Sequence, residues 1–163
     1  MYELIQLTER TYYIKSPTNI GLFRLDEKNV CLIDSGNDKD AGRRIRQVLD
    51  ANGWQLTAIY NTHANADHIG GNRYLQGQTG CRIYAPGIDC AFTRHPVLEP
   101  SFLYGGYPPK DLRHKFLLAQ ESDAAELTAE IGQIEEKIRR LIPLAWKHGC
   151  IDFWPDFDFL YRF

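Results

Sequence analysis

The feature that most constrains this chain is a short polar segment, Asn61 to Gly71, which directly follows an apolar run. The run, Leu56 to Tyr60, predicts a buried strand. Two histidines and one aspartate follow it in close succession, at His63, Asp67 and His68. A strand fixes where the following loop starts, and the short spacing makes these side chains converge, so the pattern is typical of metal ligands aimed at one point. The segment therefore predicts a metal site.

The same segment resembles the signature of the metallo-β-lactamase superfamily, which is His-x-His-x-Asp-His followed by x-Gly-Gly. His63 matches the first histidine, Asp67 the aspartate and His68 the last histidine. Asn65 stands where the family has its second histidine.

A second motif lies upstream of the loop. The run Val30 to Gly36 is similar to the family's apolar strand that ends in Asp-Thr/Ser-Gly. In the family the aspartate of this motif, here Asp34, supports the metal loop from behind. Two motifs in this order are more specific than either one alone.

The resemblance implies a fold. The superfamily fold is an α+β sandwich of two β-sheets flanked by helices (αββα), made of two similar halves that both supply metal ligands. The resemblance covers residues 1–120, which predicts one half of that sandwich, a mixed or antiparallel sheet with flanking helices. Residues 121–163 are then expected to form a C-terminal amphipathic helix and an aromatic strand for capping or dimerisation.

The resemblance also implies a metal site at His63, Asn65, Asp67 and His68, with Asp67 as the catalytic residue, either a ligand or a general base. The expected metal is zinc at low occupancy, because the Asn65 amide oxygen is a weaker donor to zinc than imidazole, and an oxygen-rich set also tolerates iron or manganese. No later motif matches the family's remaining ligands. His148 is the one late candidate, against the alternative of an ordinary exposed histidine.

Two functions remain open from the sequence. In the first, the protein is a hydrolase whose metal-activated water attacks an ester, thioester, amide or phosphoester of a small-molecule substrate. In the second, it is a truncated, non-catalytic relative that acts as a binding or interaction module. Measuring the metal content separates the two.

Local patterns predict the secondary structure of the first part of the chain. Short β-rich runs separated by turns predict an antiparallel meander at residues 3–7, 11–15, 20–25 and 30–34. Apolar residues at helical spacing predict a helix that begins at Asn37 or Asp38 and ends at Asn52-Gly53. After the metal loop we expect a short helix at 70–75, a strand at 82–85 and a turn at Pro86-Gly87.

The second part of the chain is less regular. Residues 95–115 are rich in proline and predict an irregular functional loop or insertion, whose aromatics either line a substrate pocket or pack the loop onto the body. His95 and His114 in this stretch are interpreted as surface residues. An apolar seam from Leu127 to Leu141 predicts an amphipathic helix, and alternation from Phe157 onward predicts a terminal strand.

Composition narrows the setting. The 163 residues with 44% hydrophobic content are enough for one core. A net charge of -2 with no basic run argues against nucleic acid, and no apolar run is long enough to span a membrane. Four cysteines without CxxC spacing and an acidic start without a signal peptide predict a cytoplasmic protein. Because half a sandwich exposes an apolar sheet face, we expect a homodimer.

Overall fold

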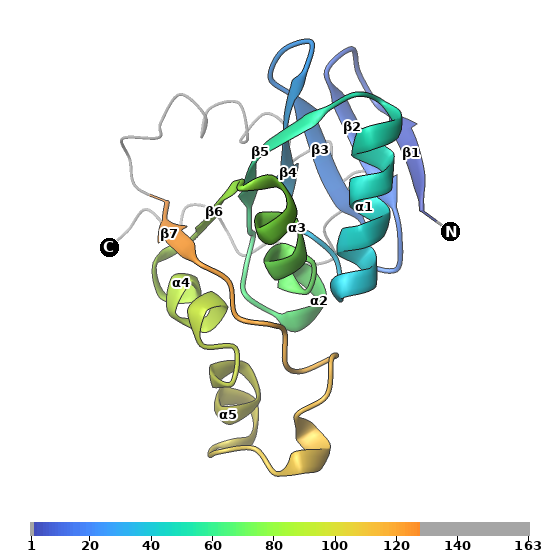
Figure 1. Ribbon diagram of the computed structural model, residues 1–163. Helices are drawn as coiled ribbons and strands as arrows, with labels where there is room; N and C mark the ends of the chain where they lie inside the picture. The colour runs from blue at the N-terminus through green and yellow to red at the C-terminus, as the bar shows by residue number, and fades with distance from the viewer. Residues whose placement is uncertain (1, 128–163) are drawn as a thin grey trace.

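A seven-stranded mixed sheet organises residues 2–127, the part of the chain that the computed structural model describes (Figure 1). The strands are hydrogen-bonded in chain order, with β1 to β4 antiparallel and β4 to β7 parallel. The sheet confirms the predicted α+β class and the antiparallel meander at the N-terminus. The strands are β1 (Glu3–Gln6), β2 (Thr11–Lys15), β3 (Ile20–Arg24), β4 (Asn29–Ile33), β5 (Gln55–Tyr60), β6 (Arg82–Ala85) and β7 (Ala124–Glu126).

Two helices, α1 (Lys39–Ala51) and α3 (Asn72–Thr79), pack side by side on one face of the sheet (Figure 1). The main core lies between them and the strands. In β4, Val30 and Leu32 are buried in this core, while Cys31 belongs to a second buried cluster. The alternation follows from the period of two in a strand, and it shows that β4 is covered on both faces.

Helix α1 begins and ends where the sequence predicts. Asp38 is its N-cap, and the side-chain oxygen accepts the Ala41 N–H at 2.8 Å. Asn52 follows the last helical residue, and Gly53 has a φ of +68°, a conformation that glycine adopts without strain. These local signals suffice because capping and turn chemistry depend on neighbouring residues only.

The helix predicted at residues 70–75 is displaced in the structure. A four-residue helix α2 (Ala66–Ile69) precedes the glycine pair, and α3 starts only at Asn72. The predicted turn at Pro86-Gly87 is also wrong, because Pro86 is the N-cap of helix α4 (Gly87–Arg94). Proline suits this position because it has no N–H to leave unpaired at a helix start.

The proline-rich stretch 95–115 is more regular than predicted. It contains helix α5 (Leu98–Tyr104) and a short 3₁₀ turn (Lys110–Leu112). Pro100 lies in the first turn of α5, where the missing N–H costs nothing, and Gly105 ends the helix with a φ of +72°. The prediction of irregular structure failed because proline was counted as a helix breaker regardless of its position.

Aromatic side chains of this stretch do not pack onto the body of the protein. Phe102, Tyr104 and Tyr107 are 77%, 55% and 73% exposed. Phe102 contacts Phe92 of α4 edge-on, with ring centroids 6.2 Å apart. The packing interpretation is therefore wrong for these three residues.

Several predictions concern the C-terminal part of the chain. Strand β7 lies beyond the boundary predicted at residue 120 and pairs with β6. The helix from Leu127 to Leu141 beyond its first residue, the terminal aromatic strand and His148 lie outside the described residues. Within residues 2–127, none of the helices has the length and apolar character needed to cross a bilayer.

Candidate functional site

The three parallel strands β4, β5 and β6 bring the residues of the candidate site to one edge of the sheet. Asp34 directly follows β4, the loop with His63 and His68 follows β5, and Asp89 lies in the first turn of α4 after β6. Parallel neighbours end at the same edge, which is where ligands bind in open α/β sheets. The topology thus explains why segments far apart in sequence meet here.

Asp34 is the centre of the hydrogen-bond network at this edge. It is 1% exposed, and its carboxylate accepts the Thr62 N–H at 2.9 Å and the Thr62 hydroxyl at 2.7 Å. The backbone has a φ of +63°, the one positive φ of a non-glycine residue within the described range. Aspartate tolerates this conformation better than most residues. Such strain at a buried charged residue is typical of functional sites.

His68 is held by the same carboxylate. It is 4% exposed, and its Nδ1 lies 2.8 Å from Asp34 Oδ2. An anionic acceptor places the ring proton on Nδ1, which leaves Nε2 as the nitrogen with the lone pair. The main-chain oxygen of His68 accepts the Ser35 N–H at 2.8 Å, so backbone and ring are both fixed against the β4 segment.

His68 lies close to both His63 and Asp67 in the structure. The two imidazole rings have centroids 4.0 Å apart, and His68 Nε2 lies 3.5 Å from Asp67 Oδ2. Two ligands bound to one tetrahedral zinc at about 2.0–2.2 Å lie about 3.4 Å from each other. The separation of these two atoms is therefore that of neighbouring ligands on one ion.

The fit to a metal ion is nevertheless partial. Within residues 2–127 no group of three or more His, Cys, Asp or Glu side chains is placed to hold an ion. Asn65 is exposed, and its side chain makes no capping bond to α2, although it stands at the N-cap of that helix. A catalytic zinc needs three protein ligands, so the described residues supply one edge of such a shell.

The protonation of His63 suits a ligand. Burial lowers the pKa of His63 below its ordinary value, and the neighbouring His68 lowers it further, while the Asp34 and Asp67 carboxyls oppose the shift. Nδ1 of His63 lies 2.9 Å from the Thr62 hydroxyl, which also bonds to Asp34. A neutral imidazole is the form that binds metal.

The glycine pair after the loop permits close packing. A Cβ at Gly70 would lie 2.3 Å from the Asn37 carbonyl carbon, and one at Gly71 would lie 2.3 Å from the Ser35 oxygen. Only glycine lets the chain approach the β4–α1 connection this closely. The pair therefore fixes the distance between the metal loop and the segment that carries Asp34.

Two carboxyls at the site, those of buried Glu99 and half-buried Asp89, could not be predicted from the sequence. Asp89 Oδ1 accepts the Ala64 N–H at 2.9 Å, and Glu99 Oε2 accepts the Ala66 N–H at 2.8 Å. Burial raises the pKa of Asp89, and burial together with the Asp67 charge raises the pKa of Glu99 to about 7. Their hydrogen-bond partners are main-chain N–H groups distant in sequence, so no sequence motif indicates these two carboxyls.

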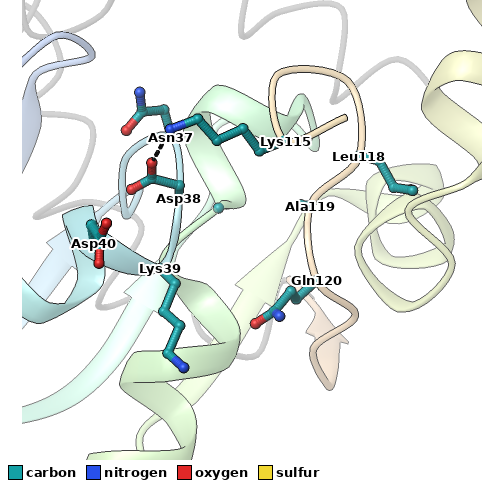
Figure 2. A pocket seen from close by; sticks show the side chains of 9 residues that line it. Asn37, Asp38, Lys39, Asp40, Lys115, Leu118, Ala119 and Gln120 are labelled. Carbon is teal, nitrogen blue, oxygen red and sulfur yellow. Dashed lines mark hydrogen bonds and ion pairs between the residues drawn. The ribbon is translucent and has the colours of Figure 1, made fainter. Parts of the chain in front are cut away.

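A pocket of about 280 Å³ lies beside the site, between the β4–α1 connection and residues 115–120 (Figure 2). Lys115 closes one side through an ion pair with Asp38 at 2.8 Å. Gly70 lines the pocket, but His63 and His68 do not. The pocket therefore lies next to the candidate metal loop but is distinct from the site that His63 and His68 form.

Comparison with known proteins gives the family. The family model of the metallo-beta-lactamase superfamily matches residues 14–150. The chain belongs to the metallo-beta-lactamase superfamily. The match confirms the resemblance read from the two motifs.

Curated relatives match short stretches of the chain. A hydroxyacylglutathione hydrolase of Methylococcus capsulatus is 42% identical over a 55-residue alignment that covers 29% of this chain and 22% of that protein. A second, from Maricaulis maris, is 48% identical over 45 residues, which is 28% of this chain and 18% of that protein. The matched stretch thus spans about a fifth of the length of these relatives.

Solved structures show the fold. A beta-lactamase from Chitinophaga pinensis superposes with a TM-score of 0.62 at 18% identity, over 78% of this chain and 45% of that one. A subclass B3 metallo-beta-lactamase of Bradyrhizobium japonicum gives 0.59 at 21% identity, again over 78% and 45%. The chain therefore has the superfamily fold and covers under half of these neighbours.

Proposed function

We propose that this chain carries the ligand loop of a metal-dependent hydrolase that cleaves a small-molecule ester or thioester. The observation that carries the proposal is the pair formed by His68 Nε2 and Asp67 Oδ2, which lie 3.5 Å apart. The other ring nitrogen of His68, Nδ1, is held by the buried Asp34 carboxylate. A carboxylate behind a ligating histidine fixes its tautomer and raises its basicity. The names of the matched relatives support an acyl-glutathione thioester as the first substrate to test.

In this proposal His63, Asp67 and His68 are the ligands that the described residues supply. A bound divalent metal, zinc in the first place and iron or manganese as alternatives, lowers the pKa of a water molecule to about 7. The Thr62 hydroxyl holds His63 through Nδ1 and ties it to Asp34. Asn65 is a weak ligand or a substrate contact, since its side chain is exposed at the loop's outer turn.

The test combines metal content with hydrolysis. We expect one or two transition-metal ions per chain and thioester hydrolysis that falls at least about a hundredfold in His63→Ala and Asp67→Ala, because each change removes a ligand. His95→Ala is the matched control, since His95 is exposed and outside the network. Folded, metal-free wild-type protein without hydrolysis would refute the proposal.

That last outcome is the one expected for the second candidate function, a non-catalytic binding or interaction module. Two observations favour it: asparagine stands in place of the second motif histidine, and the described residues complete no group of three ligands. Metal analysis of the wild-type protein decides between the two before any substrate is known.

A further inference from the structure

Two acidic side chains hold the candidate metal loop by its main chain. Asp89 comes from α4 and accepts the Ala64 N–H, while Glu99 comes from α5 and accepts the Ala66 N–H. The two bonds lie on either side of Asn65 in the sequence. The main chain is thus held on both sides of Asn65, the residue that departs from the family signature.

The two carboxyls are not ordinary surface acids. Glu99 is 7% exposed, and Asp89 is half-buried. Removing a carboxyl group from water is costly unless it is hydrogen-bonded, and here the bonding groups are main-chain N–H groups of the loop. The Asp34 charge disfavours ionisation of Asp89, and the Asp67 charge that of Glu99, so the hydrogen bonds to the loop offset this cost.

The role follows from where the bonds act. Short helix α2 begins at Ala66, so the Glu99 bond fixes the start of the turn that carries Asp67 and His68. The Asp89 bond at Ala64 fixes the residue after His63. Each bond therefore restrains the backbone next to a predicted ligand.

We propose that Asp89 and Glu99 are positioning residues that set the shape of the metal loop from α4 and α5, so that His63, Asp67 and His68 converge before metal arrives. The role in metal binding rests on the proposed function, whereas the two hydrogen bonds are present whether or not that function is correct. Helices α4 and α5 gain a defined part in the site, although neither carries a predicted ligand. Replacing a residue that supports the ligands of a metal site commonly changes the metal affinity about 10- to 100-fold.

The experiment uses the whole chain and pairs of variants. Asp89→Ala and Glu99→Ala remove the acceptors, whereas Asp89→Asn and Glu99→Gln keep an acceptor oxygen at the same place. Asp111→Ala is the control, because Asp111 is an exposed acid in the 3₁₀ turn. Thermal melts confirm that each variant is folded.

Two readouts are measured on each variant. The first is amide hydrogen exchange at Ala64 and Ala66 in chelator-treated protein, and the second is zinc affinity by calorimetry. In the alanine variants we expect exchange at the matching amide to rise at least about tenfold and zinc affinity to fall about 10- to 100-fold. The asparagine and glutamine variants and the control should stay within about threefold of wild type.

The outcomes separate this inference from the proposed function. Unchanged amide exchange in both alanine variants would overturn the inference, as would faster exchange with unchanged zinc affinity. If wild type binds no zinc while Ala64 and Ala66 lose protection only in the alanine variants, the proposed function fails and the grip of the two acids on the loop is supported.

Discussion

Replacing Asp34 by asparagine tests the hydrogen-bond network at the centre of the site. Asp34 accepts bonds from the Thr62 N–H, the Thr62 hydroxyl and His68 Nδ1. Asparagine tolerates the positive φ of this position and has the same shape, so the change removes the charge without altering the packing. It also replaces one carboxylate oxygen by an NH2 group, which is a donor, and we expect this group to face His68.

The magnitude follows from these three bonds, because the fourth bond to Asp34, from the Asn61 amide at 3.5 Å, is long and weak. A hydrogen bond to a charged group contributes about 1.5–3 kcal/mol and a neutral one about 0.5–1.5 kcal/mol, so Asp34→Asn should lower the free energy of unfolding by about 3 kcal/mol. For a chain of this size, that corresponds to a melting temperature lower by about 6–12 °C. The donor facing Nδ1 should also move the ring proton of His68 to Nε2.

The assay is urea unfolding of chelator-treated protein, with the tautomer of His68 read from its ring nitrogen resonances. Asp40→Asn is the matched control, because Asp40 is 71% exposed and forms its ion pair with Arg43 at the surface of α1. Such a pair contributes about 0–1 kcal/mol. A loss below about 1 kcal/mol in Asp34→Asn, or a proton that stays on Nδ1, would refute the assigned role of Asp34.

Burial raises the pKa of Glu99 to about 7 from 4.5, so the folded state holds a proton that the unfolded state has lost, and stability should fall as pH rises across that window. Glu99→Gln should abolish this fall in urea melts at pH 5 and 8 with chelator; an unchanged pH dependence contradicts it. Gly70→Ala should lower the free energy of unfolding by about 3 kcal/mol, since its Cβ would lie 2.3 Å from Asn37. Gly77→Ala should raise the free energy of unfolding by about 0.5–1 kcal/mol in the same melts, because a Cβ at Gly77 would meet no neighbouring residue within 4 Å. Light scattering at micromolar concentration should give a dimer, and a monomer would refute the predicted pairing.

Local chemistry made part of this fold predictable. Helix α1 was placed correctly because its capping residues, Asp38 and Asn52, act on their immediate neighbours. Helix α5 was missed because the position of Pro100 within the first turn, and not its presence, decides whether a helix forms. The same distinction explains the missed start of α4 at Pro86.

The candidate site divides in a similar way. His63, Asp67 and His68 could be proposed from the sequence because their short spacing keeps them near one another in the fold. Asp89 and Glu99 could not, because they bond to main-chain groups 25 and 33 residues away, and a backbone N–H leaves no trace in the sequence. What positions a site from a distance is visible only once the strands and helices are placed.

The most direct test of the central claim is a zinc-edge anomalous difference map from crystals of the full chain grown with zinc. We expect a zinc peak about 2.0–2.2 Å from both His68 Nε2 and an Asp67 carboxylate oxygen, with the His63 ring turned toward the same ion. A map without a peak at His68, or with His63, Asp67 and His68 pointing away from one another, would contradict it.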